Sequence, residues 1–307
     1  MSYESNDPRS ALASSPPAPA RANIPAQYLD FSALPPDEIS PLGSRTWWAR
    51  AQNVVVGHSL VRAGEHLERA GQPDEYLVLF PDASAAAEVV WTGSGSDKAR
   101  VTGRSVVVVP PGDSRIEVQA DTSVVRLFSP RATDLAARCR NRCAYTEPDP
   151  NVAAFAPWPD PVDGFRIRVH PIDEFPYEQG RFGRIFRCST IMVNVFDPDY
   201  GPRDTAHLSP HHHDDFEQVS LALDGRYTHH IRTPWTPDLA AWRADEHVEV
   251  GSPSVTVIPP PAVHTSNAVG QERNQLVDVF CPPRLDFSQR PGWVLAAEEY
   301  PVPGAAS

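Results

Sequence analysis

Residues 210–218 read Pro210-His211-His212-His213-Asp214-Asp215-Phe216-Glu217-Gln218, and an apolar run leads from there to Gly225. His211 and His213 are two residues apart, so an extended chain directs both rings to one face. Imidazole nitrogens suit Zn, Fe, Cu, Ni and Mn far better than Ca or Mg. His264, which follows three prolines at 259–261, can complete a metal site. For the triplet by itself, a solvated histidine-rich loop is the alternative interpretation.

The composition is that of a globular, strand-rich protein. The 307 residues exceed the size at which one hydrophobic core usually keeps growing, so two domains are expected. The 39 acidic side chains outnumber the 27 basic ones, and the net charge of -12 argues against nucleic acid and anionic membranes as partners. With 34 prolines, 17 glycines and little helical periodicity, the sequence predicts an all-β barrel or sandwich.

Targeting signals and disulfides are not expected. The sequence has no run of about 20 apolar residues. Residues 1–19 lack the basic start and apolar core of a signal peptide. Free thiols are favoured over a two-cysteine metal clip for the four cysteines, which are Cys139, Cys143, Cys188 and Cys281. These features predict a cytoplasmic protein without membrane association.

Two sets of short predicted strands are separated by a segment of different composition and periodicity. Residues 1–40 are rich in Ala, Pro and Ser, and we expect them to be largely disordered. A first domain is predicted at 41–130, with strands at 46–56, 75–80, 87–91, 105–109 and 118–128. A linker at 131–163 begins with a short helix at 131–142 and continues as a Pro-rich connector. A second domain is predicted at 164–307, with strands at 165–170, 189–196, 217–223, 226–232, 248–250, 254–258 and 274–280, and a helical turn in 236–244. The similar spacing suggests an internal duplication.

The second half resembles the cupin superfamily, and the whole chain resembles a bicupin. The first cupin motif is His-x-His, a carboxylate or amide after four residues, and Gly after six more; it is matched by His211, His213, Gln218 and Gly225. The second is a turn followed by His and often Asn; it is matched by His264 and Asn267, with Pro261 where Gly is usual. The match spans about residues 185–285. The resemblance implies two tandem double-stranded β-helix (jelly-roll) barrels with a metal site in the second.

The third ligand is Gln218 where most cupins of this spacing have Glu. Strict strand alternation from His213 favours Glu217 instead, so Gln218 requires a bulge or bend after His213. We favour Gln218, because the motif's gap to Gly225 fits only from position 218. Alternation then puts Gln218, Ser220 and Ala222 on the pocket face and leaves the branched aliphatics between them to pack.

The first half resembles a cupin whose metal site has been lost. By the same spacings Glu75 takes the acidic position, Glu68 and Ala70 take the two histidine positions, and Arg115 takes the last. Arginine has no lone pair for a metal, so we predict that this half is metal-free. The alternative is that Arg115 and Glu75 bind a polar or anionic ligand.

The resemblance implies one divalent transition metal per chain, Fe, Mn, Ni or Zn, held by His211, His213, Gln218 and His264. Neutral ligands would leave the metal a strong Lewis acid for a small chelating substrate. The catalytic candidates are Glu217, His229, His230 and Arg232. The alternatives are a surface carboxylate for Glu217, a hydrogen-bonded wall residue for His229 or His230, and a cross-strand ion pair for Arg232. His212 is expected to point away from the metal, toward solvent.

Three functions fit these residues. The first is an oxygenase of the dioxygenase type, hence an oxidoreductase, acting on a small oxygenated molecule. The second is a metal-dependent isomerase or lyase of sugar-acid-like substrates. The third is a non-catalytic small-molecule-binding cupin, and a homodimer is one possible assembly.

Overall fold

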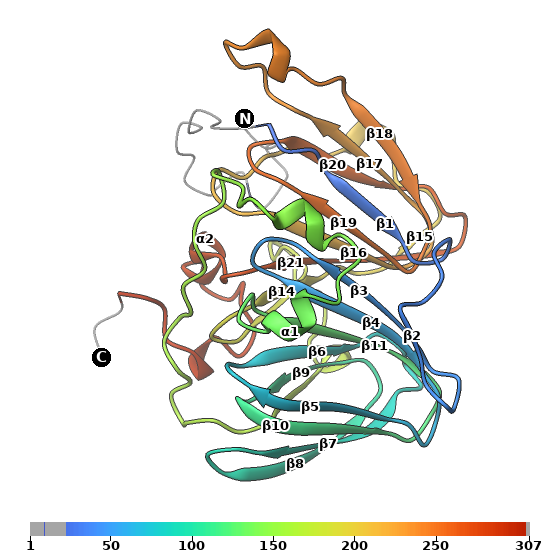
Figure 1. The fold of residues 1–307 in the computed structure, drawn as a ribbon, viewed down its shortest axis with the longest axis vertical. Helices are drawn as coiled ribbons and strands as arrows, with labels where there is room; N and C mark the ends of the chain where they lie inside the picture. The colour runs from blue at the N-terminus through green and yellow to red at the C-terminus, as the bar shows by residue number, and fades with distance from the viewer. Residues whose placement is uncertain (1–8, 10–22, 305–307) are drawn as a thin grey trace.

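The computed structural model describes Arg9 and residues 23–304, and strands dominate it (Figure 1). Its described residues contain twenty-one strands, two one-turn α-helices and several short 3-10 turns. The helices are α1 (Thr133–Ala136) and α2 (Leu285–Ser288). The prediction of an all-β chain is therefore confirmed.

The first barrel, drawn in the lower half of Figure 1, is made of a large and a small antiparallel sheet. The large sheet has the order β12 (Arg168–Pro171), β9 (Ser105–Val109), β6 (Tyr76–Phe80), β11 (Thr122–Phe128), β4 (Val55–Val61), β3 (Arg45–Arg50) and β2 (Glu38–Ile39). The small sheet has the order β5 (His66–Gln72), β10 (Gly112–Val118), β7 (Ala86–Thr92) and β8 (Ser96–Thr102). An apolar core with Trp48, Tyr76 and Phe128 fills the space between them.

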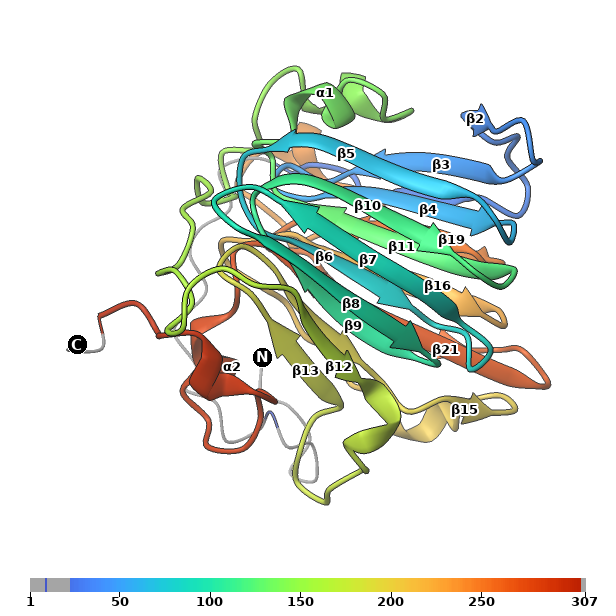
Figure 2. The same cartoon turned by 90° about the horizontal axis from the view of Figure 1, so that it is seen from below.

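The second barrel repeats this plan. Its large sheet has the order β1 (Gln27–Asp30), β19 (Ser254–Ile258), β16 (Gln218–Asp224), β21 (Arg273–Phe280), β14 (Met192–Val195) and β13 (Arg184–Arg187), and β15 (Asp199–Tyr200) also pairs with β21. Its small sheet has the order β18 (Glu246–Val250), β17 (Tyr227–Arg232) and β20 (Val263–Ala268). The strands of the two barrels run in stacked layers in Figure 2.

The outer faces of the two large sheets pack against each other. One apolar cluster contains Leu77 and Leu127 of the first barrel and Val219, Leu221 and Val279 of the second. Because strand neighbours point to opposite faces, Gln218 and Ser220 of β16 point into the second barrel. This is the alternation that the sequence predicts for β16.

Each half of the chain contributes one strand to the barrel of the other half. Tyr28 of β1 lies opposite Thr256 of β19. Val169 of β12 lies opposite Val107 of β9. The predicted division at 40 and 164 therefore differs from the division made by the sheets: part of the supposedly disordered segment is strand, and the second domain donates β12 to the first barrel. The expectation of disorder for the first 20 residues lies, Arg9 aside, outside the described residues.

The other elements agree with the sequence in part. The helix predicted at 131–142 is shorter, because α1 ends at Ala136 and a 3-10 turn follows at Arg142–Tyr145. The turn expected in 236–244 is a 3-10 turn at Leu239–Ala241. All four cysteines are free thiols, and no helix in the described ranges is long and apolar enough to span a membrane.

Candidate metal centre

A pair of backbone hydrogen bonds sets His211 opposite His264. The His211 amide donates to the His264 carbonyl (3.0 Å), and the His264 amide donates to the His211 carbonyl (2.7 Å). His264 is the second residue of β20, while His211 lies in the segment that leads to β16. His213 is held between aromatic rings: its ring centroid lies 4.4 Å from that of Phe216 and 5.9 Å from that of Phe280. The three imidazoles thus meet where the start of β20 lies beside the segment that leads to β16.

The histidines are oriented so that two of them present a nitrogen lone pair. Nδ1 of His211 lies 2.9 Å from the Ser209 carbonyl, and Nδ1 of His264 lies 3.0 Å from the Ala262 carbonyl. A carbonyl oxygen only accepts hydrogen bonds, so both Nδ1 atoms carry the proton and each Nε2 presents the lone pair with which an imidazole coordinates a metal. One ring nitrogen from each of His211, His213 and His264 lies within 4.8 Å of the others.

Gln218 turns its side-chain oxygen toward the same point. Its Oε1 lies 2.9 Å from Nε2 of His213 and 3.2 Å from Nε2 of His264. Two ligands at about 2.1 Å from a metal and at right angles to each other are about 3 Å apart. The residues 214–216 bend between His213 and Gln218, which provides the break in alternation that this ligand set requires.

A chain of hydrogen bonds fixes which end of the Gln218 amide faces the histidines. Its Nε2 donates to Oγ of Ser220 (3.0 Å), and that hydroxyl donates to Oδ1 of Asp278 (2.6 Å). The Ser220 proton is committed to the carboxylate, so the hydroxyl can only accept from Gln218. Oε1 is thereby left against Nε2 of His264, where two lone pairs face each other. A cation between them relieves this repulsion, so the donor set fits a bound metal.

Burial keeps the histidines neutral. It lowers the pKa of His264 to about 4, and it lowers the pKa values of His211 and His213 well below their usual range. Neutral imidazole is the form that binds a metal. Burial also raises the pKa of Asp278 to about 6. Among the described residues, this trio is the one cluster of His, Cys, Asp and Glu close enough to hold a metal ion.

A cavity of about 360 Å³ opens onto His211, His264, Gln218 and Asp278. Three arginines line it, Arg9, Arg181 and Arg203, together with the aromatic rings of Tyr177, Phe182, Phe196 and Tyr227. Nη1 of Arg9 lies 3.2 Å from Nε2 of His211, and its guanidinium lies 4.3 Å from the ring centroid of Phe182. Asp197, Asp199 and Asp278 also line the cavity, so its walls carry both signs of charge, with the Arg9 guanidinium beside His211.

Comparison with solved structures identifies the fold. The chain of Lactobacillus farciminis oxalate decarboxylase in a formate complex matches with a TM-score of 0.56 and 14% identity, over 86% of this chain and 88% of that chain. A Bacillus subtilis oxalate decarboxylase variant matches with a TM-score of 0.54 and 12% identity, over 86% of this chain and 78% of that chain. The chain has the bicupin fold. No protein-family model matches the bicupin's sequence, and no curated protein matches it either.

Glu217 does not reach the three converging histidines. Its carboxylate accepts hydrogen bonds from the backbone amide of Gln52 and from the hydroxyl of Tyr145. Gln52 belongs to the first half of the chain, and Tyr145 belongs to the linker. Glu217 is buried, with 7% of the residue exposed, and burial raises its pKa to about 7. The structure thus contradicts both the catalytic prediction and the alternative of a surface carboxylate, because the strand turns Glu217 toward the seam between the barrels.

The remaining catalytic candidates separate by strand face. His229 points into the barrel, where its Nδ1 lies 2.8 Å from Oγ of Ser266, and burial lowers its pKa to about 3. His230 and Arg232 are on the outer face. His230 contacts His247, and Arg232 forms an ion pair with Asp245. The structure therefore does not bring His230 or Arg232 to the metal centre, and the ion-pair alternative for Arg232 is confirmed.

His212 is also outside the trio. Its Nε2 lies 3.4 Å from Oδ1 of Asp214, and 14% of its side chain is exposed. It does not belong to the converging cluster, and it is mostly buried rather than, as expected, open to solvent.

In the first barrel, the positions that correspond to the four predicted metal ligands are each shifted by one residue from those that the sequence predicts. Val78 of β6 lies opposite Arg126 of β11, as Ser220 lies opposite Asp278. Gln218 therefore corresponds to Tyr76, and Glu217 corresponds to Glu75. Ser114 lies opposite Arg69, as His264 lies opposite His211. The counterparts of the four predicted ligands are thus Arg69, Gly71, Tyr76 and Ser114, rather than Glu68, Ala70, Glu75 and Arg115.

Arg115 and Glu75, the two residues of the predicted anion site, do not line a common pocket. Arg115 is exposed and pairs with Glu117. Glu75 is buried and accepts hydrogen bonds from Ser189 and Tyr300 of the second half. Glu75 and Glu217 are therefore matching contacts between the barrels, one from each side.

Sequence reasoning missed Asp278, Ser220 as an orienting residue, and Arg9. Asp278 has a signal, since it is a lone acid inside the apolar run of β21 at 276–280. Ser220 was placed on the pocket face without a role. Arg9 has no signal in its sequence context.

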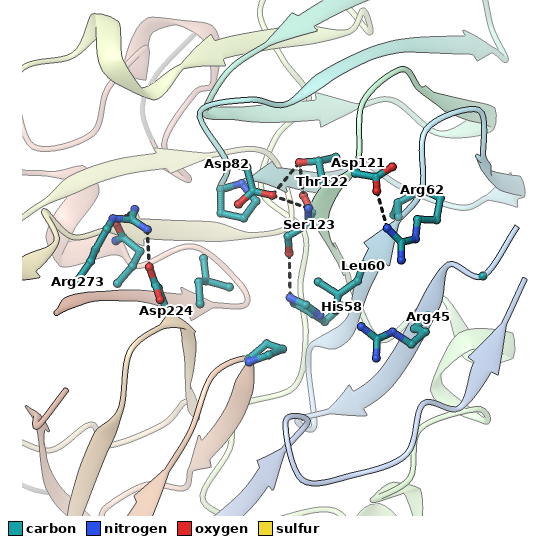
Figure 3. Close-up of a pocket in the computed structure, with 16 residues that line it drawn as sticks. Arg45, His58, Leu60, Arg62, Asp82, Asp121, Thr122, Ser123, Asp224 and Arg273 are labelled. Carbon is teal, nitrogen blue, oxygen red and sulfur yellow. Dashed lines mark hydrogen bonds and ion pairs between the residues drawn. The ribbon is translucent and has the colours of Figure 1, made fainter. Parts of the chain in front are cut away.

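A separate cavity of about 480 Å³ lies at the seam between the barrels (Figure 3). Its charged residues are largely paired: Arg62 with Asp121, and Arg273 with Asp224. His58 lines it and hydrogen-bonds to Ser123, whose Oγ lies 3.0 Å from His58 Nε2. The cavity contains no group of metal-ligating residues among those the structure describes.

Proposed function

We propose that this bicupin is a metal-dependent enzyme that binds one divalent transition metal at His211, His213, His264 and Gln218 and acts on a small oxygen-rich organic acid. The observation that carries the proposal is the meeting of imidazole Nε2 atoms and the Gln218 oxygen at one point of a buried cavity. When bound, Fe, Mn, Ni or Zn at a neutral donor set supplies a Lewis acid with positions left for a chelating substrate.

The residues around the centre support an acidic substrate. Arg9 places a guanidinium beside His211, where it can pair with a substrate carboxylate. The aromatic side chains that line the cavity limit the water around the reacting groups. The substrate we expect is therefore a small hydroxy, keto or dicarboxylic acid rather than a neutral phenol.

The reaction we place first is an oxygen-dependent oxidation or cleavage of the dioxygenase type. The four donors supplied by the protein support it, because a six-coordinate metal then has room for both a substrate and dioxygen. A lyase or isomerase is the second candidate. The Asp278 carboxylate favours it, since this group lines the cavity beside Gln218 and can serve as the base that enolisation needs. The similar solved structures are oxalate decarboxylases, which also supports a small-acid lyase.

The test begins with metal content and continues with turnover. The protein is stripped with a chelator, reloaded separately with Fe, Mn, Ni or Zn, and analysed for metal per chain. Oxygen uptake and product formation are then measured across 2-hydroxy acids, β-diketones and dicarboxylic acids. Oxygen consumed in proportion to product supports the oxygenase, and conversion under nitrogen supports the lyase or isomerase.

The matched variants are His213→Ala, at a predicted ligand, and His212→Ala, at its neighbour. Activity that survives His213→Ala would overturn the proposal, and so would a metal content near zero, or near two per chain, after reloading. Stoichiometric metal with tight binding of one acid but no conversion in either atmosphere would indicate the non-catalytic binding protein instead.

A further inference from the structure

The first barrel has an arginine where the second has its buried aspartate. Arg126 of β11 and Asp278 of β21 occupy matching positions in their sheets, opposite Val78 and Ser220. Arg126 shares its strand face with Val124 and Phe128, which belong to the apolar core inside the barrel. A cation therefore points into the barrel interior, toward the apolar core that contains Trp48 and Phe128.

No ion pair joins Arg126 to a carboxylate of the described residues, and Glu38 acts on it only from beyond ion-pair distance. Only 6% of the residue is exposed, and its Nε is enclosed without a hydrogen-bond partner in the part of the chain that the structure describes. The guanidinium lies 5.3 Å from the ring centroid of Trp48 and 5.9 Å from that of Phe128. Burial lowers its pKa, although arginine remains charged. A buried charge without a counter-charge is unfavourable, so the position calls for an anion.

A cavity is present at this charge. Arg126 lines a hollow of about 480 Å³, together with Trp48, Leu67 and Leu135, and this volume suits a small organic ligand. The other two arginines of the lining are already engaged: Arg69 pairs with Asp134, and Arg138 pairs with Glu38.

The acids of the lining limit how much negative charge a ligand can bring. Glu38 accepts a hydrogen bond from Trp48 as well as pairing with Arg138, and Glu65 accepts hydrogen bonds from Ser40 and Ser44. Glu68 is exposed at the rim. The lining has four carboxylates (Glu38, Glu65, Glu68 and Asp134) against three arginines, so a ligand with a single negative charge is favoured over a phosphate dianion.

We propose that the first barrel has a binding site for a small monocarboxylate, with the Arg126 guanidinium as its anchor and Trp48, Leu67 and Leu135 as its apolar wall. A planar carboxylate can take two parallel hydrogen bonds from a guanidinium. The site has the same place in its barrel as the metal centre has in the other, and it requires no metal. It is independent of the reaction of the second barrel.

The test is a thermal-shift titration of the full-length protein after removal of metal by a chelator, so that the second barrel cannot bind an acid through a metal. Acetate, propionate and benzoate are titrated against sodium chloride of equal ionic strength, with phosphate as a separate arm. A ligand that binds only the native state raises the Tm in a concentration-dependent way. We expect a carboxylate-dependent rise in wild type and in R115M, whose arginine is exposed, and none in R126M.

Two further variants keep the result decisive. Ala70 is exposed at the cavity, so A70W should block entry and abolish the rise while leaving Arg126 in place. Without ligand, R126M should melt no lower than wild type, because methionine fills the volume and removes a buried charge. The proposal is overturned if the rise in Tm persists in R126M, if only phosphate raises the Tm, or if no carboxylate raises it. It is also overturned if the Tm of unliganded R126M falls by several degrees. That fall would make Arg126 a purely structural partner of Trp48 and Phe128.

Discussion

At the scale of the residue, the candidate metal centre consists of neutral side chains that are fixed by their neighbours. Backbone carbonyls set the tautomers of His211 and His264, and Ser220 sets the Gln218 amide. Spacing in the sequence was enough to predict that these side chains converge, because the bend at 214–216 and the positive φ of Gly225 (80°) both fall where the motif requires them. A side chain at 225 would collide with Asn274. The role of Asp278 could not be predicted, because it depends on a pairing between β16 and β21 more than fifty residues apart.

The first residue-scale prediction concerns the third ligand. Gln218→Ala should weaken metal binding by more than the about 10–100-fold that loss of an outer hydrogen-bond partner costs, and Gln218→Glu should retain metal. Glu217→Gln should leave metal content near that of wild type, because Glu217 faces Gln52 and Tyr145. Metal per chain after dialysis measures all three variants. Loss of metal from Glu217→Gln with retention by Gln218→Ala would reverse the assignment.

The second prediction separates the members of the histidine triplet. His213→Ala and His264→Ala should each lose nearly all bound metal, because each removes one of the converging nitrogens. His212→Ala should retain it, because His212 contacts Asp214 outside the trio. Elemental analysis of the three proteins, prepared in parallel, is the measurement. Equal loss from His212→Ala would mean that the segment before β16 is held differently from the arrangement seen here.

At the scale of the element, the sequence predicts the apolar strands but not the polar ones. The runs at 105–109 and 254–258 are buried along their whole length and were predicted. The strands β5 (HLERAGQ) and β8 (SDKARVT) have mostly partly or fully exposed residues and little apolar periodicity, so neither was recognised. The one-residue error in the first barrel has the same origin. Without a bend or a histidine to fix the register, spacing alone could not decide between Glu75 and Tyr76.

The third prediction tests the exchanged strand β1. Leu29 is 6% exposed and belongs to the core cluster between the barrels. Leu29→Ala should lower the free energy of unfolding by about 2–4 kcal/mol, since it leaves a cavity in a packed core. Ile39→Ala is the control, because Ile39 is 68% exposed, and it should change stability by less than about 0.5 kcal/mol. Urea unfolding measures both. Equal effects would mean that β1 contributes little to the second barrel.

At the scale of the whole molecule, the seam between the barrels contains a titratable group. Burial lowers the pKa of His58 to about 4, and His58 lies beside the seam cavity next to Ser123 (Figure 3). The unfolded chain binds a proton at this histidine near pH 6.5, whereas the folded chain does so only near pH 4. The folded state therefore loses stability as the pH falls through this window.

The fourth prediction follows from that difference. Between pH 7 and pH 4, His58 should account for a loss of about 3 kcal/mol in the free energy of unfolding. His58→Gln cannot be protonated and should lack this part of the loss, whereas His207→Gln, at a surface histidine with 75% of its side chain exposed, should behave as wild type. Urea unfolding of metal-free protein at several pH values measures the three profiles. Parallel profiles for wild type and His58→Gln would contradict the prediction.

The pairing of β1 with β19 also has a consequence for the order of events during synthesis. Tyr28 and its partner Thr256 are separated by more than two hundred residues, so the ribosome makes the first long before the second. At about 5–20 residues per second, the wait is on the order of 10–50 s. Throughout that time the Leu29 segment has no edge to join, while β2 to β11 of the first barrel have already emerged. The nascent chain should therefore complete its second barrel only late in translation, when β19 leaves the exit tunnel and its edge becomes free for the waiting strand.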